Sequence, residues 1–121
     1  LDIYVAMAGE TLESILANLL ENARQHGGAG VQVQVTAESP TGRRGYIDII
    51  VSDNGPGVTP ANLGRVFDPF FTTARDRGGT GLGLAVVRSL VEAHGGSVEL
   101  RPSARGAKFV LRLPAVGVSP D

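Results

Sequence analysis

Cysteine and tryptophan are absent from the 121 residues, and methionine and lysine occur once each. Without cysteine, a disulfide scaffold, a thiolate metal site and a thiol nucleophile are all excluded. No stretch approaches the roughly 18 consecutive apolar residues that a membrane-spanning helix needs. Eleven basic and twelve acidic residues leave a net charge of −1. This balance disfavours a general binder of nucleic acid or of anionic membranes.

The single lysine excludes two common routes to nucleotide binding. Lys108 lies in the segment Gly106-Ala107-Lys108-Phe109, which matches neither a P-loop nor the strand lysine of a protein-kinase fold. The glycines also lack the spacing of the dinucleotide-binding fingerprint. If the chain binds a nucleotide, it must use another arrangement of residues.

Glycine, in contrast, is abundant, with 17 residues in a chain of a length typical of one domain. The chain begins at Leu1 and not at a methionine. We therefore expect residues 1–121 to form a single domain cut from a longer protein.

Periodicity predicts two long helices and two hairpins. Apolar residues recur at three- and four-residue steps in Thr11–His26 and from about Gly83 to His94, as in amphipathic helices. Alternating apolar and polar residues predict strands over residues 31–36, 46–52, 97–101 and 107–113. A short helix is expected near residues 60–66, a mobile loop over 67–81, a further strand within 1–7, and a loose tail after 113.

This order of elements predicts an α/β (α+β) fold, a two-layer sandwich in which helices cover one face of a mixed, largely antiparallel sheet. The apolar stripe of the first helix is expected to comprise Leu12, Ile15, Leu16, Leu19, Leu20 and Ala23. The inner side of the second helix is expected to comprise Leu82, Val86, Leu90 and Ala93.

Polar residues suggest two places for chemistry. Asn18 and Asn22 stand four apart on one side of the first helix, as two surface amides or as carbonyl ligands for a hard cation such as Mg²⁺. Asp53 follows an apolar strand, either to start a turn at Asn54-Gly55 or to accept a hydrogen bond from an exocyclic amine such as that of adenine.

A glycine-rich segment and an aromatic cluster follow. Gly79-Thr80-Gly81-Leu82-Gly83-Leu84 runs into the second helix, where bare backbone N–H groups and the helix start suit an anion. Arg75 and Arg77 lie just upstream. They either reach phosphate oxygens or are exposed loop arginines without a specific role. Phe67-Asp68-Pro69-Phe70-Phe71 is expected to anchor a loop that opens and closes over a ligand.

In this order and spacing, the motifs resemble the catalytic and ATP-binding domain of sensor histidine kinases, within the wider ATPase group that includes DNA gyrase and MutL-type proteins. The resemblance extends over roughly Val5 to Pro114 and implies a Bergerat-type ATP-binding fold. The segments similar to the family's N box, first glycine box, F box, second glycine box and usual ending are Asn18–Ala23, Asp53–Gly57, Phe67–Phe71, Gly79–Leu84 and Leu113-Pro114.

The resemblance implies that the domain binds ATP and Mg²⁺. Asn22 would hold the metal, Asn18 would support the phosphate or metal contacts, and Asp53 would take the adenine amine. Residues 72–80 would form the ATP lid, and Gln25 and Ala74 stand where the family often has basic residues. The other expected ATP contacts are His26, Gly55, Gly57, Arg75, Arg77, Thr80, Gly81, Leu82 and Gly83.

Neither His26 nor His94 lies in a segment that resembles the family's phospho-acceptor box. The resemblance therefore implies transfer of the γ-phosphate to a histidine in a separate dimerisation domain of the parent protein, with a response regulator downstream. We assign no catalytic residue here. The isolated domain is expected to be monomeric and cytoplasmic, without nucleic-acid or direct membrane contact, whether or not the parent is a membrane-bound sensor.

Two alternatives stay open. A gyrase- or MutL-like switch that hydrolyses ATP would need a catalytic glutamate four residues before the metal-binding asparagine, where this chain has Asn18. A degenerate interaction module would keep the fold without nucleotide, although it would have no need to retain Asn22, Asp53, Gly81 and Gly83.

Overall fold

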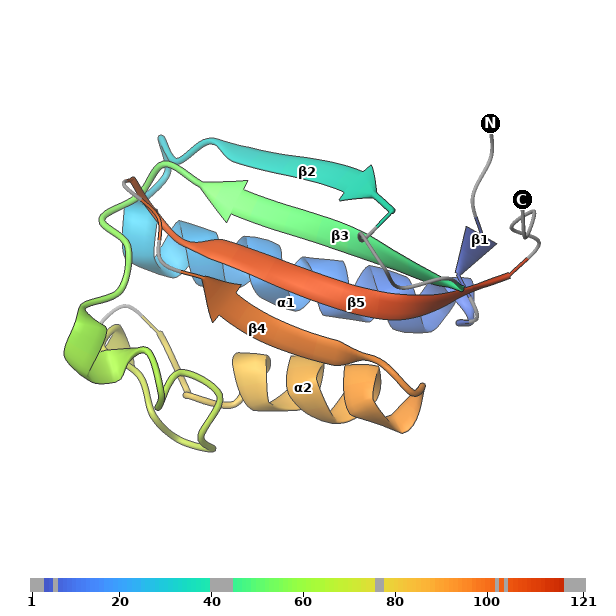
Figure 1. Ribbon diagram of the computed structural model, residues 1–121. Helices are drawn as coiled ribbons and strands as arrows, with labels where there is room; N and C mark the ends of the chain where they lie inside the picture. Colours follow the sequence, from blue (N-terminus) through green and yellow to red (C-terminus); the bar gives the residue numbers. More distant parts are fainter. Residues whose placement is uncertain are drawn as a thin grey trace.

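The computed structural model of the chain describes residues 4–5, 7–39, 45–75, 78–101, 103 and 105–116. These residues form two helices, five strands and one 3₁₀ turn (Figure 1). In chain order the elements are β1 (Tyr4–Val5), α1 (Gly9–Gly27), β2 (Val33–Glu38), β3 (Tyr46–Asp53), η1 (Pro60–Asn62), α2 (Gly83–Ala93), β4 (Ser97–Arg101) and β5 (Lys108–Val116).

The five strands form one sheet, in which β5 pairs with β3, β4 and β1, and β2 pairs with β3. Both predicted hairpins, β2–β3 and β4–β5, are confirmed. Every pairing among the described strands is antiparallel, so the mixed character that we expected does not appear in this part of the chain. The strand expected within residues 1–7 is β1, and the chain stays paired beyond Leu113 because Ala115 and Val116 face β1.

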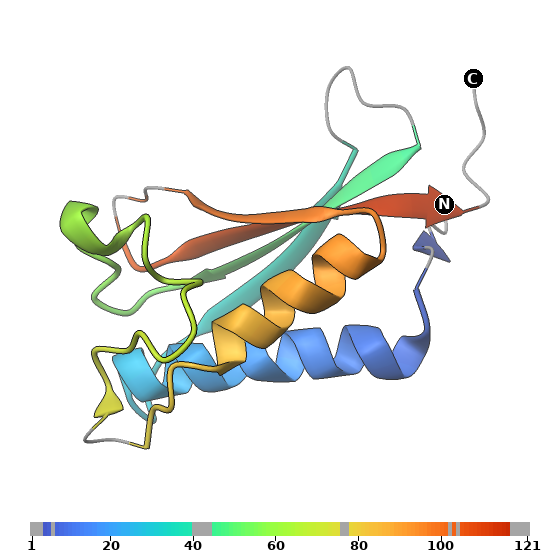
Figure 2. The ribbon, with the colours of Figure 1, turned by 90° about the horizontal axis from the view of Figure 1, so that it is seen from below.

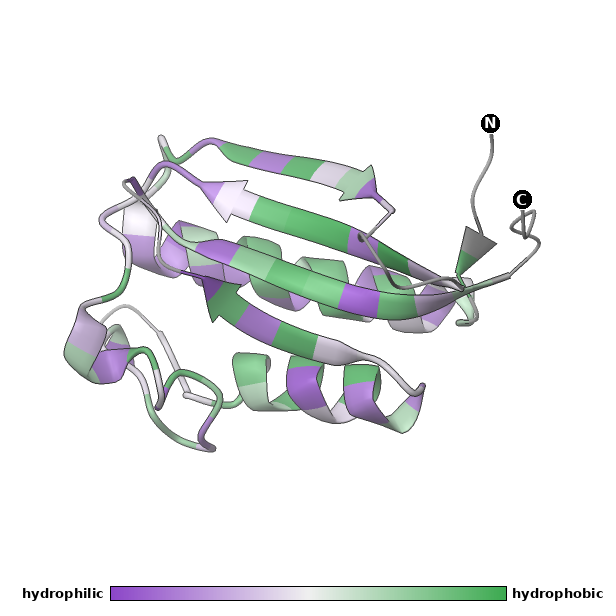
Figure 3. Cartoon of the chain, in the orientation of Figure 1, coloured by the Kyte–Doolittle hydropathy of each residue, from purple (hydrophilic) through white to green (hydrophobic). Residues whose placement is uncertain are grey.

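Both long helices lie side by side on one face of the sheet (Figure 2), which confirms the two-layer prediction. The core between the layers is apolar, and hydrophobic colours run along the central strands β3 and β5 in Figure 3. Its buried members are Ile15, Leu19, Ile47, Val51, Val87, Val91, Ala107, Phe109, Leu111 and Leu113.

Of the four residues predicted on the inner side of the second helix, Leu90 packs against the core, but the other three do not. Val87 and Val91 of α2 are fully buried, whereas Leu82 and Val86 are 40% and 42% exposed and Ala93 is exposed. Apolar residues occupy most of the circumference of this helix, so periodicity allows two stripes, and packing on the sheet selects the one with Val87 and Val91.

Two further expectations need correction. Leu20 of α1 is 47% exposed, because it lies about 100° around the helix from the buried Leu19. The helix expected near residues 60–66 is reduced to η1 and a series of turns, with Arg65 N–H bonded to the Asn62 carbonyl three residues back. Gly64 in this segment lowers the helix propensity.

An ion pair lies on the face of the sheet away from the helices. Asp48 and Arg112 are direct partners across β3 and β5, and Arg112 donates from Nε and Nη2 to the two carboxylate oxygens at 2.8 and 2.9 Å. The Asp48 side chain is 4% exposed. Hydrogen bonding to Asp48 raises the pKa of the Arg112 guanidinium.

Candidate functional site

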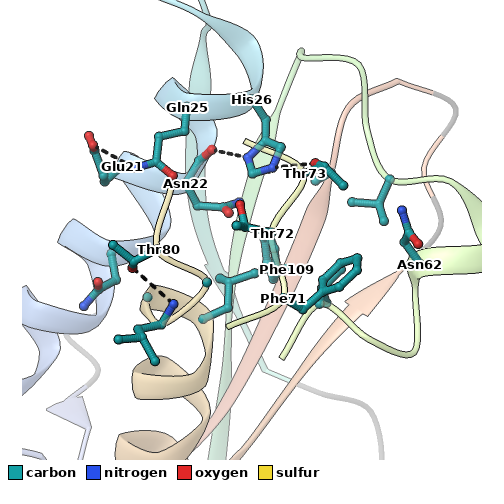
Figure 4. A pocket seen from close by; sticks show the side chains of 18 of the residues that line it. Glu21, Asn22, Gln25, His26, Asn62, Phe71, Thr72, Thr73, Thr80 and Phe109 are labelled. Atoms are coloured by element: carbon teal, nitrogen blue, oxygen red, sulfur yellow. Dashed lines mark hydrogen bonds between the residues drawn. The ribbon is translucent and has the colours of Figure 1, made fainter. Parts of the chain in front are cut away.

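A cavity of about 500 Å³ opens between the C-terminal half of α1, the loop after β3, and the loop that leads into α2 (Figure 4). Several residues singled out in the sequence meet there. The predicted residues that line it are Asn18, Asn22, His26, Asp53, Gly57, Thr80, Gly81, Leu82 and Gly83.

Helix α1 brings one polar face to the cavity through positions spaced by three and four residues. The Asn18 amide donates from Nδ2 to the Ser14 carbonyl at 2.9 Å. This bond orients the side chain so that Oδ1 faces the first residue of α2, where it would be the atom nearest to a Cβ on Gly83. Asn18 therefore presents its carbonyl oxygen at the junction of the two helices.

Glu21 also lines the cavity, and its charge is already matched. Arg24 donates to both of its carboxylate oxygens at 2.6 Å, and Gln25 donates to Oε2 at 3.2 Å. The hydrogen bonds from Arg24 lower the pKa of the Glu21 carboxyl. Arg24 is paired with Glu21 and does not line the cavity.

His26 has a protein partner at each ring nitrogen (Figure 4). Nδ1 lies 2.9 Å from the backbone carbonyl of Asn22, and Nε2 lies 3.2 Å from the Thr73 hydroxyl. A carbonyl can only accept, so Nδ1 carries the proton. The sequence did not indicate the contact with Thr73, because 47 residues separate the two.

Asp53 ends β3 at the wall of the cavity. Its Oδ1 accepts from the backbone N–H of Gly55 at 2.9 Å and of Ala107 at 3.2 Å. The first bond is the turn that the sequence suggested, and the second ties the residue to the chain just before β5. Since Asp53 also lines the cavity, its carboxylate can serve the turn through one oxygen and a ligand through the other.

Backbone crowding explains two glycines near this wall. Gly57 has a φ of +80°, and a Cβ there would lie 2.8 Å from the Gly106 carbonyl oxygen. Gly106 has a φ of +70° and lies directly against the backbone of Asp53. Glycine at these positions allows the two backbone segments to approach each other closely.

The N-terminal end of α2 also borders the cavity. The Leu82 N–H bonds to the Thr80 hydroxyl at 3.3 Å, and no side chain caps the helix. The N–H groups of its first turn have no acceptor within the helix, so together with the positive end of the helix dipole they can receive an anion.

Two predicted residues lie outside the lining of the cavity. Gly55 donates its N–H to Asp53 and does not line the cavity. Arg75 also lies outside the lining and donates from Nη2 to the Phe70 carbonyl at 2.7 Å. Arg77 is outside the described residues.

The aromatic cluster is divided between the core and the cavity. Phe67 packs edge-on against Phe109, with ring centroids 6.1 Å apart. Phe71 lines the cavity and lies under the Arg65 guanidinium, 4.5 Å from the ring centroid.

Residues that line the cavity but were not proposed as contacts include Val58, Thr59, Asn62, Val66, Ala107 and Phe109. Phe109 lies in β5 and Asn62 ends η1, and the others lie in the segments beside these elements. The sequence did not indicate that these residues would lie close to α1, because that depends on the packing of elements far apart in the chain.

No helix in the described part of the chain is long and apolar enough to cross a membrane. Likewise, the described residues contain no cluster of three or more histidine, cysteine, aspartate or glutamate side chains that could hold a metal ion.

Residues 7–117 match the model of a family described as histidine kinase-, DNA gyrase B- and HSP90-like ATPases. The chain is 38% identical over 104 residues to the alginate biosynthesis sensor protein KinB of Pseudomonas aeruginosa, covering 85% of this chain and 17% of that protein. It is 40% identical over 114 residues to the sensor histidine kinase ZraS of Salmonella typhimurium, covering 93% and 23%. The chain thus spans less than a quarter of the length of these relatives.

Solved structures show the same likeness. The mycobacterial sensor histidine kinase MprB superposes with a TM-score of 0.79 at 31% identity, over 92% of this chain and 76% of that one. Full-length ShkA, whose structure is a complex with AMPPNP, superposes with a TM-score of 0.74 at 36% identity, over 90% and 22%.

Proposed function

The chain belongs to the family of histidine kinase-, DNA gyrase B- and HSP90-like ATPases, and from this premise we propose how its cavity works. The chain is the ATP-binding catalytic domain of a two-component sensor histidine kinase. In our proposal the cavity binds ATP with Mg²⁺, and the γ-phosphate passes to a histidine in a separate dimerisation domain of the parent protein.

One observation carries this proposal. The carboxylate of Asp53, the amide of Asn22 and the uncapped first turn of α2 border the same cavity. A carboxylate accepts hydrogen bonds and suits the exocyclic amine of adenine, while guanine would present a carbonyl in its place. Free N–H groups at a helix start suit phosphate. Adenine and phosphate thus each meet a group of matching chemistry.

The donors that line the cavity fit Mg²⁺ only if the nucleotide contributes most ligands. Magnesium takes few protein ligands and accepts substrate phosphate oxygens. Asn22 of α1 lines the cavity and would supply an amide oxygen. Bound there, the ion would neutralise phosphate charge. Asn18, with its oxygen turned toward Gly83, would support the metal or phosphate contacts.

The remaining roles concern the parent protein. Residues 1–121 would form one domain of it, monomeric when isolated and located in the cytoplasm, where ATP is available. A response regulator would receive the phosphoryl group downstream. The domain would contribute to catalysis by positioning ATP and by neutralising charge. Asn18, in place of the glutamate of a gyrase-like switch, argues against hydrolysis as the main activity.

Calorimetric titration of the chain with AMPPNP, with and without Mg²⁺, tests the proposal. We expect AMPPNP to bind with a micromolar to submillimolar dissociation constant that becomes lower when Mg²⁺ is present. In parallel titrations, ATP should bind more tightly than GTP. Absence of binding at millimolar nucleotide would contradict the proposal and favour the interaction module.

To separate transfer from hydrolysis, the chain is mixed with ATP and the parent's helical domain. Acid-labile phosphate on that domain is expected, whereas rapid phosphate release by the chain alone would indicate the ATPase switch.

Asp53→Asn tests the adenine contact. A carboxylate accepts hydrogen bonds on both oxygens, but an amide must turn its NH₂ either toward the N–H groups of Gly55 and Ala107 or toward the adenine amine. We expect ATP affinity to fall by about tenfold or more. Glu13→Gln, the same chemical change on an exposed part of α1, should leave affinity unchanged. Equal affinities for wild type and Asp53→Asn would exclude this contact.

A further inference from the structure

A side-chain hydrogen bond joins α1 to the cavity-lining loop that follows the aromatic cluster. His26 Nε2 and Thr73 Oγ1 are 3.2 Å apart (Figure 4), and both residues line the cavity. The adjacent Ala74 is fully buried, and its N–H bonds to the Thr72 hydroxyl at 3.0 Å. Residues 72–74 are therefore placed against the cavity with a defined backbone.

The ring of His26 is oriented before it reaches Thr73. Its Nδ1–H donates to the Asn22 carbonyl at 2.9 Å, which leaves Nε2 of the neutral ring as an acceptor for the Thr73 hydroxyl. The other histidine gives a useful comparison. His94 Nδ1 lies 2.7 Å from the carbonyl of Leu90, also four residues back, but no bond to its Nε2 is found among the described residues. The long-range contact distinguishes His26.

We propose that His26 is a positioning residue that holds residues 72–74 at the mouth of the cavity through Thr73, and that this bond slows the exchange of nucleotide. The proposal deepens the proposed function and rests on it. Since both ring nitrogens have protein partners, His26 acts through the loop and not as a polar ligand of the nucleotide. The same ring contacts the backbone of Asn22, so it connects the loop to the residue assigned to the metal.

Two pairs of variants separate the effect of the hydrogen bond from the effect of side-chain volume. Thr73→Val removes the hydroxyl at nearly constant volume, and Thr73→Ser restores it. In His26→Asn, the amide nitrogen can replace Nδ1 as the donor to the Asn22 carbonyl but cannot reach Thr73. In His26→Gln, the amide nitrogen can replace Nε2 as the partner of the Thr73 hydroxyl. Thr73 is exposed, so its variants should fold normally. His94→Asn is the matched control.

The main measurement is the release rate of a fluorescent ATP analogue, displaced by excess ATP in a stopped-flow instrument. We expect Thr73→Val and His26→Asn each to speed release by about 3- to 10-fold. The double variant should be no faster than the singles, because both remove one interaction. Thr73→Ser, His26→Gln and His94→Asn should stay near the wild-type rate. Unchanged release in Thr73→Val, or multiplied effects in the double variant, would overturn the proposal.

A second measurement needs no nucleotide. Long-range ¹H–¹⁵N NMR spectra of the free chain should show His26 protonated at Nδ1, and Thr73→Val should move its Nε2 resonance while leaving the His94 signals in place. An unmoved Nε2 resonance would show that the bond does not form. If the wild-type chain binds no ATP, the proposed function fails, while this spectrum still reports on the bond.

Discussion

At the scale of single residues, the glycines of the second glycine box have different roles. Gly81 has a φ of +77°, and a Cβ there would overlap the backbone of Phe70. Phe70 itself has a φ of +68° and donates its N–H to the Gly81 carbonyl at 2.8 Å. Gly83, in contrast, lies in α2 beside Asn18. The protein's own backbone, independently of any ligand, requires glycine at position 81.

Alanine substitutions at three glycines test this reading. Gly81→Ala combines a left-handed backbone with a clash and should lower the free energy of unfolding by about 2 kcal/mol or more. Gly78 has a φ of +90° in open space, so Gly78→Ala should cost about 1 kcal/mol. Gly64, with neither feature, is the control. Urea denaturation measures all three, and equal stabilities for Gly81→Ala and Gly64→Ala would contradict the argument.

At the scale of elements, α2 packs against the core through Val87 and Val91, with Leu84 and Leu90 partly buried beside them. Val87 and Val91 are fully buried against the sheet, while the neighbouring Val86 is 42% exposed. Loss of buried methyl groups removes transfer free energy and leaves a cavity, whereas loss of exposed ones changes little. The N-terminal end of this helix is also a wall of the cavity, so its packing controls where those N–H groups lie.

Val87→Ala should therefore lower the free energy of unfolding by about 2 kcal/mol. Val86→Ala, the same change one residue earlier, should lower it by less than about 0.5 kcal/mol. Urea denaturation monitored by circular dichroism compares the two. A larger loss in Val86→Ala would mean that the other stripe of α2 faces the sheet.

At the scale of the whole molecule, the two faces of the sheet are stabilised differently. The helices bury one face in apolar contacts. On the other face, the Asp48–Arg112 pair links β3 to β5. Asp53 ends β3, and its Oδ1 accepts from the N–H of Ala107, which immediately precedes β5. The ion pair therefore links the two strands that position one wall of the cavity.

Removing one partner should harm the fold more than removing both. Arg112→Leu leaves a nearly inaccessible carboxylate without its cation, which is costly, whereas the double variant Asp48→Leu/Arg112→Leu leaves no buried charge. We expect the thermal midpoint of Arg112→Leu to be the lowest, with the double variant closer to wild type. A double variant less stable than Arg112→Leu would show that the pair stabilises the fold beyond this desolvation effect.

The sequence alone determined the elements and the membership of much of the site. Helical and alternating periods depend on neighbouring residues, so they predicted α1, α2 and both hairpins. The sequence identified several of the residues that line the cavity, from the spacing of Asn18 and Asn22 on α1, the position of Asp53 after a strand, and the glycines before α2.

The tertiary structure decided how these parts meet. It selected Val87 and Val91 as the buried stripe of α2, because that helix was apolar on more than one side. It turned Arg75 to the Phe70 carbonyl and joined His26 to Thr73. Such contacts depend on the packing of the core and on loop conformation. A local pattern contains no information about which distant backbone or hydroxyl group lies within hydrogen-bonding distance.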